Sequence, residues 1–346
     1  MTTGGESAPL VAVVTPVYNG AKYLRQTMES VQRQTYPNIV HVICNNGSTD
    51  GTGRIIEEFR DRPVPLLVFE NETVLPLAAN WDKAFSHVPA EAAYARLLCA
   101  DDLIRADALE KLVAMAETHP GVELILSQDV FNDRIHSARL PRSLVHDGRR
   151  FVRDLLLGRV GWLAFHHFFV RLHPADRTGR FIEDYWSPDP HVVLRSALRG
   201  EIAYLHEPLA YNRIHADSVT GKELKNKGVQ FQLVQLHLLE HFGREVFSER
   251  EFKRLIADFR VSSSRALMRW KLSGDSARVA EMRAQLDQHG CSPSVRDYVA
   301  GLLGWPVSSI RWRLNERPAG QHLDERQFVA MGASARHGGP ERQPVA

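Results

Sequence analysis

Short apolar runs alternate with helix-like segments through the first part of the chain, and this alternation constrains the fold more than any other feature. Each run has the length of a buried strand. The segments between the runs place apolar side chains three and four positions apart, as one face of a helix does. The runs are Leu10–Thr15, Ile39–Cys44, Pro65–Phe69, Ala93–Leu98 and Val122–Leu126. The pattern predicts right-handed βαβ units, and hence an α/β fold with a mostly parallel sheet flanked by helices.

Polar motifs follow three of these runs, at the point where each strand should end. They are Tyr18-Asn19, Asn45–Asp50 and Asp101-Asp102. Ligands of open parallel sheets bind at the carboxyl ends of the strands. We therefore expect the three motifs to converge on one binding site.

The adjacent carboxylates Asp101 and Asp102 indicate a cation site. Two such groups at a strand end repel each other unless a cation or a donor lies between them. Mg²⁺ typically takes one or two carboxylates plus phosphate oxygens, so the pair suits a diphosphate whose charge a metal must neutralise. The alternative is that one carboxylate caps the next helix. That alternative would be favoured for an isolated pair, but the neighbouring motifs favour the metal.

Composition narrows the range of partners. The 346 residues carry a formal net charge of +2 and no dense Lys/Arg run, so no nucleic-acid partner is expected. The cysteines Cys44, Cys99 and Cys291 form no CxxC pair and are expected to be reduced thiols. The sequence opens without a basic, apolar leader, and no run reaches the ~20 apolar residues of a membrane span. We therefore expect a cytoplasmic protein.

The regular alternation stops before the last third of the chain, and we divide the sequence there. Residues 1–8 are expected to be a flexible N-terminus and 9–221 the α/β domain. Residues 222–316 keep helical spacing and predict a helical extension, and the polar tail 317–346 is expected to be disordered. Trp and Arg are mixed within 302–314, so peripheral membrane contact through this segment is left open, as is a homodimer.

Five motifs, in this order, resemble the signatures of family 2 glycosyltransferases. They are Val13–Gly20, Ser30–Pro37, Asn46–Thr52, Ala100–Asp102 and Glu207–His215. The ordered set is far more specific than any one motif, and the resemblance covers about residues 9–220. It implies a GT-A fold, an inverting hexosyltransferase activity in polysaccharide or glycoconjugate biosynthesis, and Mg²⁺ or Mn²⁺ as cofactor. It also implies a nucleotide-diphosphate sugar as donor, with a UDP-sugar expected; the acceptor is left open.

The resemblance assigns roles at the donor site. Asp102 would hold the metal, with His215 as a second candidate ligand. Arg213 and His215 would lie near the diphosphate, where a cation stabilises developing negative charge. The residues implied for the nucleotide are Thr15, Pro16, Tyr18, Asn45, Asn46 and Asp101.

Three positions depart from the family pattern at the nucleotide site. The family usually has an Asp pair where this chain has Asn45-Asn46, so the base would meet a neutral acceptor. A hydrogen bond to a neutral partner contributes ~0.5–1.5 kcal/mol, against ~1.5–3 kcal/mol for a charged one. The family also often has an acidic residue at the position of Cys99, which is expected to be a buried thiol in the core.

An inverting transfer needs a base to accept the proton of the acceptor hydroxyl. By the resemblance, Asp189 occupies the position of this base, directly before a helix that contains Leu194 and Arg195. Asp184 and Glu183 are the alternatives. The acidic residue that usually precedes the base is Pro188 here, which is a further departure from the family.

Three other interpretations remain at this point, and one of them is a scaffold whose C-terminal helices dimerise. A sugar-nucleotide-binding protein without catalysis would fit the Asn45-Asn46 and Pro188 departures. A nucleotidyltransferase would also use a parallel sheet and carboxylate-bound Mg²⁺, but it normally carries a Gly-rich, basic loop after the first strand. The doublet His166-His167 lies in an apolar, aromatic segment and is expected to be a pair of core histidines on a strand.

Overall fold

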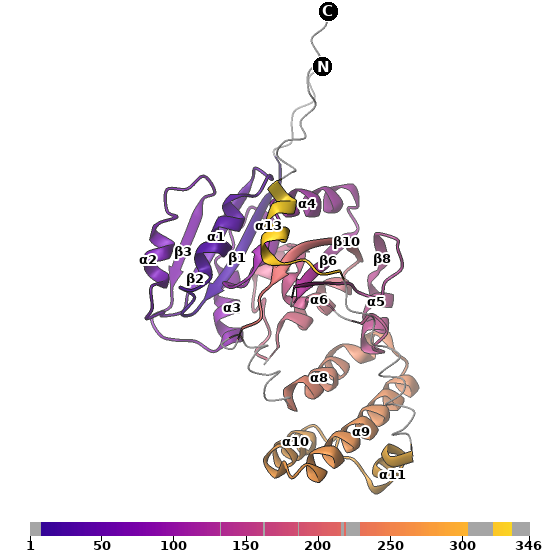
Figure 1. The fold of residues 1–346 in the computed structure, drawn as a ribbon. Coiled ribbons are helices and arrows are strands. Elements are labelled where there is room, and N and C mark those ends of the chain that lie inside the picture. Colours follow the sequence, from indigo (N-terminus) through magenta and orange to yellow (C-terminus); the bar gives the residue numbers. More distant parts are fainter. Residues whose placement is uncertain are drawn as a thin grey trace, which may run out of the picture. The chain divides into compact units, whose positions relative to one another are not determined.

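The computed structural model describes residues 8–131, 133–161, 163–185, 187–215, 218, 229–303 and 321–333 (Figure 1). Two compact units emerge from the contacts within the chain. The first unit is Met1–Ile214 together with Gln321–Ala346, and the second is His215–Gly320. The first unit contains the sheet, and the second consists of helices in the part that the structure describes.

Four parallel strands form one half of the sheet, in the order β3-β2-β1-β4. Their bounds are β1 Leu10–Val17, β2 Ile39–Asn45, β3 Leu66–Glu70 and β4 Ala92–Leu97. In β1 and β2 nearly every side chain is buried, which is why both read as continuous apolar runs in the sequence. Because β1 lies between β2 and β4, the chain reverses its direction of winding at β1, and the loops after β1 and β4 face a common crevice.

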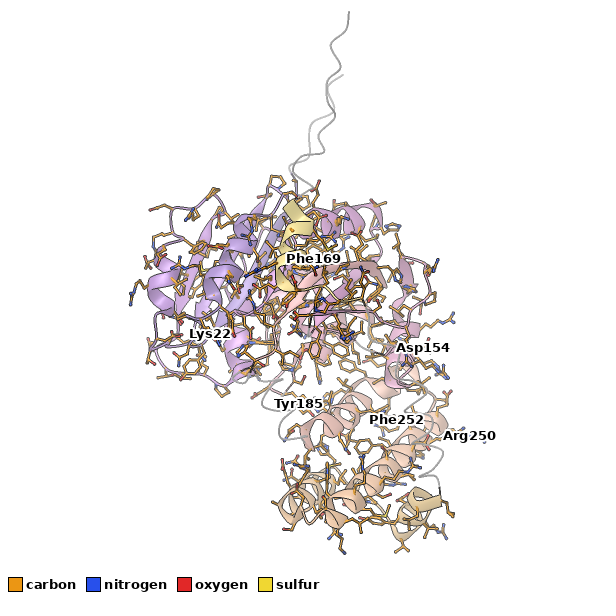
Figure 2. All side chains as sticks on the ribbon, viewed as in Figure 1. Lys22, Asp154, Phe169, Tyr185, Arg250 and Phe252 are labelled. Atoms are coloured by element: carbon orange, nitrogen blue, oxygen red, sulfur yellow. The ribbon has the colours of Figure 1, made fainter. Side chains whose placement is uncertain are left out.

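The other half of the sheet continues as β9-β6-β10-β5 and is mixed. Strands β6 and β10 are parallel, whereas β9 is antiparallel to both β4 and β6. Phe169 of β9, labelled in Figure 2, stacks on Tyr94 of β4 with ring centroids 5.0 Å apart. The bounds are β5 Leu103–Ile104, β6 Val122–Phe131, β7 Arg134–His136, β8 Val145–Asp147, β9 Phe169–Arg171 and β10 Glu201–Asn212.

The helices of the first unit flank this sheet. Helix α4 contributes Leu109 and Leu112 to the buried cluster that contains Val11 and Val13 of β1. The remaining bounds are α1 Leu24–Gln32, α2 Thr52–Glu57, α3 Leu77–Ser86, α4 Ala108–Thr118, α5 Gly148–Leu156, α6 Asp189–Ala197 and the short 3₁₀ helices η1 Phe165–His167 and η2 Pro174–Arg177. The predicted α/β fold is therefore confirmed, although short antiparallel strands make the sheet more mixed than expected.

The end of the described chain returns to the first unit, which differs from the expectation of a disordered tail. Helix α13, Glu325–Ala333 (yellow in Figure 1), follows a short extended segment. Phe328 is fully buried and shares a core cluster with Leu103, Val130 and Tyr211. The tail sequence is polar overall, but this pair of apolar residues, Leu323 and Phe328, is enough to anchor it.

The second unit has its own core. Its helices are α8 Val229–Val246, α9 Glu249–Leu272, α10 Ser276–Gln288 and α11 Val295–Leu303. Leu236, Phe259 and Met282 come from three of them and belong to one buried cluster. Helix α9 begins with a reciprocal capping box between Ser248 and Glu251. In the described part of the chain, no helix combines the length and the apolar character that a membrane crossing needs.

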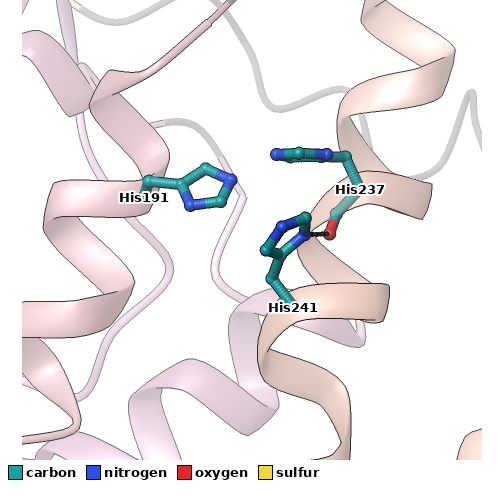
Figure 3. Close-up of side chains that lie close together, drawn as sticks. All are labelled: His191, His237 and His241. Atoms are coloured by element: carbon teal, nitrogen blue, oxygen red, sulfur yellow. Dashed lines mark hydrogen bonds between the residues drawn. The ribbon is translucent and has the colours of Figure 1, made fainter. Parts of the chain in front are cut away.

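Aromatic and imidazole side chains of α8 and α9 make several close contacts. Arg244 lies over the ring of Phe252 (labelled in Figure 2), 4.1 Å from its centroid. His237 and His241 are one turn apart on α8, with ring centroids 4.1 Å apart, and His241 Nδ1 donates to the carbonyl of His237 (Figure 3). His191, also drawn in Figure 3, belongs to α6 of the first unit.

Candidate functional site at the strand ends

The loops after β1 and β2 are tied together by side chains of the Asn46–Thr52 motif. Ser48 Oγ accepts from the backbone N–H of Asn19 at 2.9 Å, and Asn19 Oδ1 accepts from Thr49 at 2.9 Å. Asp50 accepts from the N–H of Ala21 at 3.0 Å. Asn19 has a positive φ of 49°, a conformation that Asn tolerates better than most residues. These hydrogen bonds thus fix the shape of the loop after β1.

Thr15, Pro16 and Tyr18 differ sharply in exposure. Thr15 is fully buried, and its hydroxyl is 2.9 Å from Nε2 of His41. Burial lowers the pKa of His41 to about 3, so this imidazole is neutral. Tyr18 follows the strand and is 52% exposed, which leaves its ring open to a ligand. Of these three predicted nucleotide residues, Tyr18 is therefore the one whose side chain is accessible.

Asn45 and Asn46 are both buried, and their amides bond within the protein. Asn45 donates to Glu70 Oε1 at 2.9 Å. Asn46 Oδ1 accepts from Asn71 and from the N–H of Leu75, and its Nδ2 donates to the Leu75 carbonyl, each at 2.9 Å. Asn46 therefore shapes the loop between β3 and α3, and the nearest negative charge to Asn45 is the exposed Glu70.

Asp102 is 2% exposed and accepts hydrogen bonds on both oxygens. Oδ2 lies 3.2 Å from His167 Nε2 and 3.4 Å from His166 Nε2, and Oδ1 accepts from the backbone N–H of Arg213 at 2.9 Å. Burial opposes the charge of Asp102, but the two histidine hydrogen bonds outweigh burial and hold its pKa below the ordinary value. Asp102 is thus an ionised, positioned carboxylate.

The histidine pair is part of this site, contrary to the expectation of two core histidines on a strand. Both lie in the 3₁₀ helix η1, directly before β9. Burial and the nearby His166 together lower the pKa of His167 to about 3. Burial also opposes the charge of His166, but Asp102 and Asp189 raise its pKa above the ordinary value. His166 is therefore the more basic member of the pair.

The three acidic candidates for the base have different surroundings. Glu183 and Asp184 are exposed and form surface ion pairs with Arg195 at 4.0 Å and Arg180 at 3.4 Å. Asp189 is half-buried at the start of α6, where Ser187 Oγ donates to it at 3.0 Å.

Burial raises the pKa of Asp189, and His166 and the Ser187 hydrogen bond oppose this effect. The charge of Asp189 acts on both His166 and Cys99, whose thiol lies within the loop after β4. The charge of Asp189 thus reaches the histidine that contacts Asp102, whereas Glu183 and Asp184 pair with Arg195 and Arg180.

Arg213 is 8% exposed and lies at the same loop. Its Nη1 donates to the carbonyl of Asp101 at 2.7 Å, and its Nη2 donates to Gln26 at 2.6 Å. Glu325 of α13 accepts from Nε at 3.0 Å and from Nη2 at 2.6 Å. His215 is the first residue of the second unit, and Ser218 donates to its carbonyl.

The chemistry of the loop after β4 fits a hard cation. One ligand atom each from Cys99, Asp101 and Asp102 lies within 4.8 Å of the others. Asp101 is half-exposed, and the pKa of Asp102 is held low, so carboxylate oxygens of the kind that Mg²⁺ and Mn²⁺ prefer are present. The burial of Asp102 makes Asp101 the more accessible of the two carboxylates.

Sequence reasoning missed the roles of His166, His167 and Glu325 at this site. The histidine doublet was visible, but nothing local connects it to a carboxylate 65 positions earlier. The sequence around Glu325 does not indicate its contact with Arg213, because the two residues are 112 positions apart. A separate cavity of about 210 Å³, lined in part by Asp82 and Phe181, includes none of the predicted site residues.

Solved structures with the same arrangement define the class of fold. Staphylococcus aureus TarS residues 1–349 in complex with UDP superposes with a TM-score of 0.53, at 17% identity, over 72% of this chain and 70% of that one. The mannosyltransferase PcManGT from Pyrobaculum calidifontis, in complex with GDP-Man and Mn²⁺, gives 0.50 at 16% identity, over 96% and 88%. The protein therefore has a GT-A glycosyltransferase fold.

The sequence relationship is more specific. Residues 12–180 match the model of glycosyl transferase family 2. The putative glycosyltransferase EpsH of Bacillus subtilis is 24% identical over 80% of this chain and 81% of its own length. EpsE of the same organism is 32% identical over 34% of this chain.

The first curated relatives match over only part of their length. The chain spans 42% of EpsE, and only 14% of the glycosyltransferase GlyA of Streptococcus pneumoniae, to which it is 35% identical over 102 residues. The resemblance inferred from the motifs is nevertheless confirmed at the level of the family.

Proposed function

We propose that this protein is an inverting hexosyltransferase that moves a sugar from a nucleotide-diphosphate sugar to an acceptor hydroxyl, with a divalent cation at the Asp101-Asp102 loop. The observation that carries the proposal is the grouping of Asp102, His166 and Asp189. His166 contacts the carboxylate at the cation loop and carries a pKa raised by both aspartates, so the predicted metal site and the predicted base lie in one electrostatic neighbourhood.

For the donor we propose a UDP-sugar at the ends of β1, β2 and β4. The exposed ring of Tyr18 would pack against the nucleoside, and the buried Asn45 and Asn46 would shape the loops around it. UDP and UDP-GlcNAc are bound in TarS structures, and GDP-Man in that of PcManGT, which supports a nucleotide sugar in general. Glu70 would supply negative charge beside Asn45.

Asp101 and Asp102 would hold the cation, Mg²⁺ or Mn²⁺, which would neutralise the charge of the leaving diphosphate. Asp102 is kept ionised by its histidine hydrogen bonds, so it need not lose a proton on binding. The half-exposed Asp101 offers the carboxylate that a cation reaches first. His215 remains a candidate for the diphosphate, whereas Arg213 already directs four of its five N–H groups to protein acceptors.

Asp189 would act as the general base. It would take the proton of the acceptor hydroxyl while the acceptor oxygen forms a bond to the anomeric carbon. The bond from that carbon to the diphosphate oxygen breaks, and its electron pair leaves with the diphosphate. A carboxylate with a raised pKa is a stronger base than an ordinary one, and burial gives Asp189 this property.

Three further parts of the proposal concern the cellular location, membrane contact and oligomeric state. We propose that it works in the cytoplasm, with peripheral membrane contact through 302–314 and a homodimer as further possibilities to test. Leu302 and Leu303 at the end of α11 are exposed, and residues 304–314 lie outside the described part of the chain. The match of residues 12–180 to glycosyl transferase family 2 disfavours a nucleotidyltransferase.

A thermal-shift panel tests the donor and cation together. The protein is heated with UDP, GDP and dTDP, each with and without Mn²⁺. A ligand at 100 times its dissociation constant stabilises a protein by about 2.7 kcal/mol, so one nucleotide should raise the melting temperature only when the cation is present. Asp101→Asn and Asp102→Asn should lose this cation-dependent shift. If no nucleotide stabilises the wild-type protein in the presence of Mn²⁺, the proposed donor site is wrong.

A further inference from the structure

The C-terminal segment that contains α13 reaches the candidate active site through one ion pair. Glu325 accepts from Arg213 Nε at 3.0 Å and from Nη2 at 2.6 Å, which is a two-point contact between a guanidinium and a carboxylate. The same guanidinium donates to the carbonyl of Asp101, and the backbone N–H of Arg213 donates to Asp102. Arg213 thus links α13 to both residues of the proposed cation loop.

The position of Glu325 is fixed independently of this ion pair. Phe328 is fully buried on the next turn of α13, in a cluster with Leu103 and Tyr211. The segment before the helix is held by two backbone hydrogen bonds, from Ile135 N–H to Gln321 at 3.0 Å and from Leu323 N–H to Asp133 at 2.9 Å. Glu325 is therefore presented to Arg213 by a docked element and not by a chance surface contact.

The charges around Arg213 give this ion pair a consequence for cation binding. Arg213 is 8% exposed, and a buried guanidinium without a partner is strongly unfavourable. Arg213 also contacts both residues of the loop: its guanidinium donates to the backbone carbonyl of Asp101, and its backbone N–H donates to the carboxylate of Asp102. If Glu325 did not hold the guanidinium, Arg213 could turn to the carboxylates of Asp101 and Asp102 and compete with a cation for their oxygens.

We propose that Glu325 is a positioning residue for the cation site: it holds Arg213 so that the Asp101-Asp102 carboxylates stay available to the metal and the diphosphate. This inference rests on the proposed function for its ligand. It assigns to residues 321–333 a part in the active site of the enzyme, although they follow the helical unit in the sequence. The side chain acts through Arg213 and need not touch the substrate.

The test compares Glu325→Gln with Arg326→Gln in the full chain. Arg326 is the exposed neighbour of Glu325 on the same helix, so its substitution changes one charge at the same place without touching Arg213. We expect Glu325→Gln to weaken Mn²⁺-dependent UDP binding about tenfold, measured by calorimetry, while Arg326→Gln binds like the wild type. Glu325→Asp keeps the charge and should recover part of the affinity, which a loss of helix packing alone would not explain.

A second measurement does not depend on any ligand. Hydrogen exchange is followed in the unliganded protein for backbone amides of residues 98–106, with melting temperature as a check on global folding. Glu325→Gln should speed exchange in this loop, and Arg326→Gln should not. If Glu325→Gln matches Arg326→Gln in both exchange and affinity, the inference is overturned. If the wild-type protein fails to bind UDP with Mn²⁺, the proposed function fails instead, and the exchange result alone decides the role of Glu325.

Discussion

Two carboxylates in the first unit have pKa values moved in opposite directions by their surroundings. Hydrogen bonds from His166 and His167 hold the pKa of Asp102 low, whereas burial raises that of Asp189. His166 lies close enough to both to respond to each charge. Such a divergence is typical of sites that separate a fixed anion from a proton acceptor. This raised pKa is the reason why we propose Asp189, among the three acidic candidates, as the base.

Asp189→Asn keeps the shape of the side chain and removes its basicity. We expect turnover to fall by about 10²-fold or more, which corresponds to ~3 kcal/mol of activation free energy. The affinity for UDP with Mn²⁺ should stay within a factor of two, because the base acts on the acceptor. The matched control is Asp184→Asn, whose side chain pairs with Arg180 at the surface and should keep most of its activity. Equal losses in the two variants would remove Asp189 from the mechanism.

The strand-end loops are the elements in which sequence motif and structure agree most closely. Strands β1 to β4 and the helices between them were predictable because each is long enough to show its own period. Their polar ends meet because parallel strands all end at one edge of the sheet. The position of Asp101 and Asp102 at this edge follows from the sequence alone.

Other elements of the site could not be predicted, and each for a physical reason. Strand β5 has two residues and η1 has three, too few for any periodicity. The side chains of Asn45 and Asn46 are expected beside a base; their hydrogen bonds to Glu70 and to the carbonyl of Leu75 could not be read from the motif. The contact of Arg213 with Glu325 joins residues 112 positions apart, which no local pattern can encode.

Asn46→Asp tests the structural role that the β3–α3 loop assigns to this amide. Asn46 Nδ2 donates to the carbonyl of Leu75, and a carboxylate there would place two acceptors against each other. An unsatisfied buried group costs about 1–3 kcal/mol, so we expect the free energy of unfolding to fall by that amount in a urea titration. Glu72→Gln changes a charge on the exposed part of the same loop and serves as the control. A stability for Asn46→Asp equal to that of the control would contradict this role.

At the scale of the molecule, the first unit contains histidines that folding keeps neutral below pH 6.5. Burial lowers the pKa of both His41 and His167 to about 3, whereas an unfolded histidine titrates near 6.5. The unfolded chain therefore binds more protons between these two values. Above pH 6.5 the free energy of unfolding therefore keeps the full contribution of these neutral histidines. It loses this contribution as the pH falls from 6.5 toward 3.

We expect the free energy of unfolding to decrease on acidification by about 1.4 kcal/mol per pH unit for each such histidine. His41→Gln removes one of them and should reduce the slope between pH 6 and pH 4, even if it lowers stability at pH 7 through the lost contact with Thr15. His119→Gln, at the partly exposed end of α4, is the comparison variant. Urea titrations at several pH values measure the slopes, and identical slopes in all three proteins would refute this account.

The docking of α13 on the first unit has a consequence for how the protein is made. Arg213 leaves the ribosome 112 residues before Glu325 does. At about 5–20 residues per second, translation must run for roughly 5–20 s before the carboxylate that pairs with this guanidinium exists. During that interval the strands of the α/β domain have been synthesised, but Glu325, which contacts Arg213 beside the Asp101-Asp102 loop, has not. The site is therefore complete only after the helical unit has also been synthesised.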